Sequence, residues 1–166
     1  MSADSPQARV GIVVGSRSDI AAAERAAAVL EELGVPSEIR VISAHRAPLL
    51  LTHFAETAES RGIGVFIAIA GLAAHLPGVL AAQTTLPVVG VPMPGGVSDG
   101  LDALLAVVQM PKGVPVATVG VGNGENAGLL AAQILAVADP GLRERINARR
   151  AAAAQAIADD PANEGL

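Results

Sequence analysis

Apolar and polar residues follow one another in two kinds of block along this chain of 166 residues. Short runs rich in Val, Ile and Ala are apolar at nearly every position, which is typical of strands buried on both faces of a parallel sheet. The segments between them repeat apolar residues every three or four positions, the spacing of an amphipathic helix. These patterns predict strands at 9–15, 37–43, 64–70, 86–91 and 114–121. They predict helices at 19–33, 48–61, about 76–83, 98–108, 125–138 and 140–158.

The alternation of strands and helices predicts an α/β fold in which helices cover both faces of a parallel sheet. Five strands fit a flavodoxin-like three-layer sandwich with the strand order 2-1-3-4-5. No repeat or linker divides the chain, so we expect one α/β catalytic domain over 9–158, a flexible N-terminus over 1–8 and a frayed C-terminus over 159–166. The last two helices exceed what the sheet needs for cover, and we expect their Ala-rich faces to pack against a neighbouring subunit.

The composition points to self-association. Apolar residues make up 51% of the chain and charged residues only 16%, which is below the usual share in a soluble domain. Few charges are therefore left to cover the surface, and we expect a homo-oligomer that buries part of it. The chain has no Cys, which excludes disulfides, thiolate metal sites and Cys nucleophiles.

Charge and aromatic content argue against two classes of partner. The net charge is −5, no run of Lys and Arg occurs, and Trp and Tyr are absent, so an extended nucleic-acid surface is not expected. Residues 1–8 lack the basic start and apolar core of a signal peptide. No apolar run reaches the length of a membrane span without a break, so we expect no membrane contact and a cytoplasmic location.

The candidate chemistry lies in the loops that follow the predicted strands. In an open parallel sheet, ligands bind outside the carboxyl ends of the strands. These loops contain residues 16–19, 43–46, 71–75 and 92–96, and they bring two of the three histidines to one edge. We therefore expect one ligand site at this edge of the sheet.

The loop after the first strand reads Gly15-Ser16-Arg17-Ser18-Asp19. Gly15 allows a sharp turn, and two hydroxyls with the first amides of the next helix suit an anion such as phosphate. Helix capping by Ser18 or Asp19 explains the same residues equally well. Because a phosphate repels a carboxylate, Asp19 fits ribose hydroxyls better than the phosphate itself.

The loop after the second strand places His45 beside Arg46. The planar guanidinium of Arg suits a phosphate, and a His side chain both gives and takes a proton near neutral pH. A loop His that caps a backbone carbonyl is the simpler alternative. His75 either lines the same pocket or has a structural role, and His53 lies within a predicted helix as a solvent or packing residue. The spacing of the histidines and the lack of a carboxylate pair predict no metal.

Five stretches, taken together and in order, resemble a known family. They are GSRSD (15–19), SAHRAP (43–48), AGLAAHLPG (70–78), GLDALLAVVQMPKGVPVATV (100–119) and NAGLLAAQIL (126–135). They are similar to the N5-carboxyaminoimidazole ribonucleotide mutases of bacterial purine biosynthesis over roughly 10–138. The resemblance implies an isomerase that moves a carboxylate from the exocyclic nitrogen of a ribonucleotide to C4 of its imidazole. It also implies no metal, nucleotide or organic cofactor, and a homo-octamer with active sites at subunit contacts.

The resemblance also assigns roles to residues. It implies that Ser16, Ser18, Asp19 and Arg46 bind the ribose phosphate and that His45 is the general acid and base. A segment at 109–111 is implied to close the site of a neighbouring subunit. The full set of implied substrate-binding residues is Ser16, Ser18, Asp19, Ser43, Arg46, Gly71, Ala73, Ala74, His75, Leu76, Gln109, Met110 and Pro111.

Three departures from the family pattern leave alternatives open, one of them the pair Ala103 and Ala106 in the helix at 102–108, where the family commonly has Ser. Ala47 stands where the family usually has Thr, and Leu72 stands where it usually has Gly, which would be unfavourable if the backbone there needs a positive φ. A non-catalytic phosphoribosyl- or nucleotide-binding module is one alternative, and Leu72 encourages it. A related branch carboxylates aminoimidazole ribonucleotide directly with CO2, but it resembles SAHK-type loops and lacks AAHLPG. Arg46 and residues 75–78 therefore favour the mutase.

Overall fold

The computed structural model describes residues 9–165, which contain one parallel sheet in the order β2-β1-β3-β4-β5. This is the predicted flavodoxin-like order, and the alternation of strands and helices is confirmed. The predicted flexible N-terminus over 1–8 lies outside the described residues. The strands are β1 (Arg9–Val14), β2 (Ser37–Val41), β3 (Ile63–Ala70), β4 (Val88–Pro92) and β5 (Ala117–Thr118).

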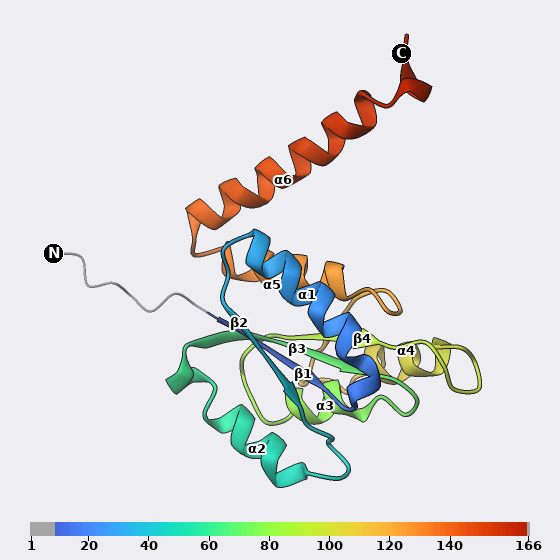
Figure 1. The fold of residues 1–166 in the computed structure, drawn as a ribbon. Coiled ribbons are helices and arrows are strands. Elements are labelled where there is room, and N and C mark those ends of the chain that lie inside the picture. The colour runs from blue at the N-terminus through green and yellow to red at the C-terminus, as the bar shows by residue number, and fades with distance from the viewer. Residues whose placement is uncertain (1–8, 166) are drawn as a thin grey trace, which may run out of the picture.

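Helices cover the sheet on both faces, which makes three layers (Figure 1). One apolar core joins the sheet to α1 and α5, and the other joins it to α2, α3 and α4. The helices are α1 (Ile20–Glu32), α2 (Pro48–Glu56), α3 (His75–Ala81), α4 (Leu101–Val108), α5 (Gly124–Leu135) and α6 (Pro140–Ala158). Short 3₁₀ helices are η1 (Arg17–Asp19), η2 (Glu59–Arg61) and η3 (Pro161–Asn163).

The central strands carry apolar side chains toward both cores. In β1, Val10, Ile12 and Val14 face the core under α1 and α5, while Val13 faces the other core. Gly11 leaves room for the ring of Phe66, because a Cβ at this position would lie 2.9 Å from ring atoms. The apolar runs found in the sequence are thus strands buried on both sides, as predicted.

Several predicted elements are shorter in the structure, among them the helix predicted over 48–61, which ends at Glu56 and is followed by η2. The strand predicted over 114–121 pairs with β4 only at Ala117 and Thr118. Pro115 has no N–H to donate, and the Val114 N–H bonds to the Pro111 carbonyl in a turn at 3.2 Å. The helix predicted from residue 98 begins at Leu101, because Gly100 and three of the five residues before it have positive φ and form a loop.

The two C-terminal helices differ from each other. Contrary to the prediction, α5 covers the sheet together with α1, and the two helices share one core. They pack so closely that a Cβ on Gly124 would lie 2.1 Å from the Ala22 carbonyl oxygen, and a Cβ on Gly128 would lie 2.6 Å from that of Ala26. The helix α6 buries Leu142 and Ile146 and then projects away from the body (Figure 1). Its last turns are exposed and end in η3, where the prediction of a frayed terminus stays untested. Within residues 9–165, no helix is long and apolar enough to span a membrane.

Candidate active site

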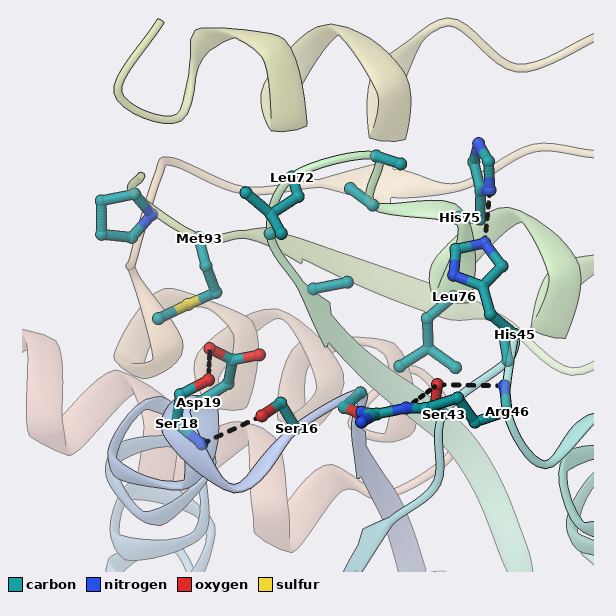
Figure 2. A pocket seen from close by; sticks show the side chains of 17 residues that line it. Ser16, Ser18, Asp19, Ser43, His45, Arg46, Leu72, His75, Leu76 and Met93 are labelled. Carbon is teal, nitrogen blue, oxygen red and sulfur yellow. Dashed lines mark hydrogen bonds between the residues drawn. The ribbon is translucent and has the colours of Figure 1, made fainter. Parts of the chain in front are cut away.

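A pocket of about 530 Å³ opens at the carboxyl edge of the sheet (Figure 2). It is formed by the loops after β1, β2, β3 and β4, as expected for a doubly wound sheet. The polar part of the lining, which we name the polar wall, consists of Ser16, Ser18, Asp19, Ser43, His45 and Arg46. The apolar part, which we name the apolar wall, consists of Ala70, Gly71, Leu72, Ala73, Ala74, Leu76, Met93 and Pro94. Gly15, Ala44 and His75 complete the lining.

The loop after β1 is organised by Ser16. Its Oγ accepts a hydrogen bond from the Ser18 N–H at 3.4 Å and so caps η1. The Ser18 hydroxyl donates to Oδ1 of Asp19 at 3.0 Å, and Asp19 makes no side-chain cap hydrogen bond to α1. Helix capping by Ser18 or Asp19, one of the two open interpretations, is therefore wrong. These two polar side chains line the pocket, where they are available to a ligand.

Arg46 ties the loop after β2 to the loop after β1. Its Nη2 donates to the Gly15 carbonyl at 3.2 Å, and its Nε donates to Oγ of Ser43 at 3.2 Å. The same Ser43 oxygen accepts the backbone N–H of Arg46 at 3.3 Å. The guanidinium is thereby held at the pocket beside Ser16 and Ser18, which places a fixed positive charge next to two hydroxyls.

His45 and His75 form a direct pair. Nε2 of His45 lies 2.6 Å from Nδ1 of His75, and the rings meet edge to face with centroids 4.8 Å apart. At this distance one ring nitrogen must donate and the other accept, so each ring determines the tautomer of the other. The ring of His45 therefore pairs with a second His, and the alternative of a simple carbonyl cap is wrong. His53 is exposed on α2 and lies outside this pocket.

The loop between β3 and α3 has an unusual backbone. The Ala74 N–H donates to the Gly71 carbonyl at 2.9 Å, which closes a turn, and φ is 57° at Leu72 and 44° at Ala74. Positive φ at a residue other than Gly, Asn or Asp costs about 1–3 kcal/mol. Ala74 is buried, but the Leu72 side chain is 66% exposed. The suspected conflict between a Leu at position 72 and a positive φ is thus real.

The loop after β4 completes the apolar wall. Met93 packs against the loop after β3 so closely that a Cβ on Gly71 would lie 3.3 Å from Cβ of Met93. The sequence placed residues 92–96 at this edge but gave no reason to select Met93 and Pro94 as lining residues. The signal that identifies them is positional, since they directly follow a buried strand next to β3 in the sheet.

Most of the predicted binding residues meet in this pocket. The exceptions are Gln109, Met110 and Pro111, which do not line it within the same chain. They follow α4, and Met110 packs on α3, where a Cβ on Gly78 would lie 3.2 Å from its Sδ. Among the described residues, no group of three or more His, Cys, Asp and Glu could hold a metal ion.

Comparisons with known proteins give the same family throughout. A family model described as AIR carboxylase matches residues 9–156. N5-carboxyaminoimidazole ribonucleotide mutase of Mycobacterium tuberculosis (strain H37Rv) is 56% identical over 138 residues, which are 83% of this chain and 79% of that protein. The mutase of Bacillus subtilis is 53% identical over 146 residues, or 87% of this chain and 90% of that protein.

A solved structure and a longer relative extend the comparison. The crystal structure of Treponema denticola PurE has a TM-score of 0.83 and 28% sequence identity, and the match covers 95% of this chain and 98% of that one. Phosphoribosylaminoimidazole carboxylase of Schizosaccharomyces pombe is 54% identical over 133 residues, which are 80% of this chain but 24% of that protein. With the family model matching nearly the whole described chain, the chain belongs to the AIR carboxylase family.

Proposed function

We propose that this chain is an isomerase of purine biosynthesis that converts N5-carboxyaminoimidazole ribonucleotide to 4-carboxy-5-aminoimidazole ribonucleotide. The observation that carries the proposal is the meeting of a His pair with an Arg- and Ser-lined anion site in one pocket. Relatives named as N5-carboxyaminoimidazole ribonucleotide mutase, at more than half identity over most of the chain, support it.

The polar wall binds the ribose phosphate. Arg46 offers the charge, and Ser16 and Ser18 offer hydroxyls at the start of α1, where backbone amides also favour an anion. Asp19 accepts hydrogen bonds from ribose hydroxyls, which separates its negative charge from the phosphate. The imidazole ring then lies toward His45 and the apolar wall.

The first chemical step breaks the carbamate N–C bond. The electron pair of this bond stays on the exocyclic nitrogen, the carboxylate carbon leaves as CO2, and the nitrogen takes a proton from the His45 imidazolium. The products held in the pocket are aminoimidazole ribonucleotide, CO2 and neutral His45. No oxidation or reduction occurs.

The second step forms the new C–C bond. C4 of the imidazole attacks the carbon of CO2, and C4 then gives its proton to His45, which becomes an imidazolium again. The carbon lost from nitrogen is the carbon gained at C4, and the proton count of the enzyme is unchanged. One group that changes protonation twice is therefore sufficient, as expected for a His general acid and base.

His75 orients His45 for both steps. When His45 is an imidazolium, its Nε2–H donates to Nδ1 of His75 across 2.6 Å, and His75 must then be neutral with its proton on Nε2. The remaining ring nitrogen of His45 is directed toward the pocket (Figure 2). The pair thus leaves one nitrogen of His45 for the substrate.

The assembly we propose is a homo-octamer with active sites at subunit contacts. Large apolar side chains that remain exposed in the single chain support it, among them Leu49 at 83%, Val137 at 77% and Ile157 at 67%. In this assembly Gln109, Met110 and Pro111 reach the pocket of a neighbouring subunit. The substrate is a small ribonucleotide, the enzyme is cytoplasmic, and it uses no cofactor. Light scattering that gives a monomer mass would overturn the assembly.

The deciding assay offers the purified protein the N-carboxylated ribonucleotide and follows the ultraviolet absorbance of the C4 acid. We expect conversion well above the spontaneous rate, and its absence would reject the proposal. Tight binding without turnover would identify a binding module instead. A parallel reaction with aminoimidazole ribonucleotide and added CO2 tests direct carboxylation, since the fission-yeast relative is named a phosphoribosylaminoimidazole carboxylase. Efficient product formation from CO2 alone would favour that reaction.

A further inference from the structure

Three serines belong to the polar wall, and they differ in what their hydroxyl protons do (Figure 2). Oγ of Ser16 accepts the Ser18 N–H, and Oγ of Ser43 accepts two N–H groups of Arg46. A hydroxyl oxygen that accepts still has its own proton to donate. Among the described residues, Ser18 is the one serine of this wall whose hydroxyl donates to another protein group, Oδ1 of Asp19 at 3.0 Å.

This contact between Ser18 and Asp19 competes with phosphate binding by Ser18. A Ser hydroxyl has one proton, and a carboxylate oxygen and a phosphate oxygen are both acceptors. Ser18 therefore cannot donate to Asp19 and to a phosphate at the same time. While the proton is directed at Asp19, the Ser18 oxygen offers only lone pairs to an anion. The hydroxyl has to turn away from Asp19 before Ser18 can bind a phosphate.

The movement required is small, and its cost falls on Asp19. Rotation about the Cβ–Oγ bond of Ser18 redirects the proton without moving the backbone of η1, which Ser16 caps. Side-chain rotations take picoseconds to nanoseconds. Asp19, however, loses its donor and then lies beside an anion. A ribose hydroxyl is a donor that can take the place of Ser18, whereas the dianion of a simple phosphate ester has no proton to offer.

We propose that the Ser18–Asp19 hydrogen bond belongs to the ligand-free pocket and opens when a ribose phosphate binds. The Ser18 hydroxyl turns to the phosphate, and a ribose hydroxyl donates to Asp19 in its place. No covalent bond changes, because the hydrogen stays on the Ser18 oxygen throughout. This inference rests on the proposed function, which places a ribose phosphate on the polar wall.

The exchange of partners makes the pocket selective for ligands that carry both groups. A ribose phosphate replaces the hydrogen bond that it breaks, so every donor and acceptor of the pair is satisfied again. A phosphate ester without hydroxyls leaves the carboxylate of Asp19 without a donor, and a site built to bind a hydroxyl rejects ligands that lack it for this reason. The Ser18–Asp19 contact therefore lowers the affinity for simple phosphate esters relative to ribose phosphates.

The experiment is a double-mutant cycle on the binding of methyl phosphate, a phosphate ester without hydroxyls. Calorimetry at pH 8, above the second phosphate pKa of about 6, gives Kd for wild type, Ser18→Ala, Asp19→Ala and the double variant. Asp19→Ala should tighten binding in both backgrounds, because it removes a negative charge. With Ser18 present the gain should be larger by about two- to tenfold, the effect of one net hydrogen bond, because the hydroxyl is released as well.

Two further measurements sharpen the cycle. Ser18→Thr keeps a hydroxyl at this position and is the matched control, so Asp19→Ala should retain its larger gain in that background. Ribose 5-phosphate is the second ligand, and it brings the hydroxyls that donate to Asp19. Asp19→Ala should therefore weaken the binding of ribose 5-phosphate while it tightens the binding of methyl phosphate.

The outcomes separate this inference from the proposed function. An equal gain from Asp19→Ala with and without the Ser18 hydroxyl would overturn the inference, since charge alone then explains the gain. Tighter binding of ribose 5-phosphate by Asp19→Ala would overturn it as well. None of these measurements needs turnover, so a wild type that forms no C4 acid refutes the mutase while the cycle still reports on the contact. If wild type binds ribose 5-phosphate no better than Arg46→Ala does, the phosphate is not on the polar wall and both proposals fail.

Discussion

The polar wall of the pocket is held by hydrogen bonds, whereas the apolar wall is held by packing and by a strained turn. Ser43 and Arg46 share contacts with each other and with the Gly15 carbonyl, so the loops after β1 and β2 fix one another. In the apolar wall, Gly71 packs against Met93, and Leu72 occupies the left-handed region. The polar wall is therefore pre-organised at low conformational strain, whereas the apolar wall contains a strained turn.

This difference indicates a division of labour between the walls. Groups that bind a phosphate or move a proton must keep their positions within a fraction of an ångström, which a hydrogen-bonded loop provides. A wall that excludes water needs only apolar bulk in the right place. The four variants below test the polar wall and the residues next to it, from the largest expected effect to the smallest.

His45→Asn should have the largest effect, because it removes the only proposed proton carrier of the polar wall. We expect kcat to fall by about a hundredfold to ten-thousandfold, the range for loss of a general acid and base. Binding of the product, measured by calorimetry, should change little. His53→Asn is the matched control, since His53 lies on α2 outside the pocket. A His45→Asn enzyme that keeps wild-type turnover would remove His45 from the mechanism.

Arg46→Ala should weaken binding more than chemistry. Loss of a charge-assisted contact to phosphate is worth about 1.5–3 kcal/mol, so we expect KM to rise by about tenfold to a hundredfold. Arg46→Lys keeps the charge but not the planar fork, and it should recover only part of the loss. Arg40→Ala, on β2 and paired with Glu38, is the control. An unchanged KM in Arg46→Ala would mean that the phosphate binds elsewhere.

His75→Phe tests the hydrogen bond between the rings of His45 and His75. It removes the acceptor for His45 but keeps a ring, and a typical net hydrogen-bond contribution of about 0.5–1.5 kcal/mol predicts a two- to tenfold fall in kcat. KM should be nearly unchanged, because His75 acts through His45. His75→Asn retains a polar partner and should restore part of kcat. A larger change in KM than in kcat would instead indicate direct contact with the substrate.

Ala47→Thr should have the smallest effect and concerns stability. Ala47 occupies the N-cap position of α2 and provides no side-chain hydrogen bond there. A Thr hydroxyl at an N-cap contributes about 0.5–2 kcal/mol, which corresponds to a rise in Tm of a few degrees for a domain of this size. Pro48, already at the first helical position, should make the added cap effective. A lower Tm would show that the loop before α2 cannot accommodate the larger side chain.

The sequence predicted the sheet order and most of the pocket because both depend on local pattern. Runs such as 64–70 are apolar at every position except Gly64, and the topology then brings the loops after them to one edge. The length of β5 could not be read from its composition, since its pairing is limited by Pro115 and by a single neighbouring strand. The position of Gln109 to Pro111 is likewise not a local property, because it depends on how subunits meet.

The strain at Leu72 could be predicted from the sequence only in part. The sequence could state that a Leu there would conflict with a positive φ, but not that the turn adopts one. That depends on the Ala74 to Gly71 hydrogen bond and on the position of Met93 in the next loop. The residue at position 72 can be read from the sequence, whereas the positive φ that makes a Leu unfavourable there is set by tertiary structure.

The projecting end of α6 provides an internal probe of assembly. Residues 150–158 of this helix are exposed in the single chain, so their amides are protected only by the helix itself and should exchange with deuterium quickly. The amides of β1 and β3, in the centre of the sheet, should exchange slowly whatever the state of association. Comparing these two segments in one mass spectrum at several protein concentrations would therefore report subunit contact at α6 without a label, a tag or an activity assay.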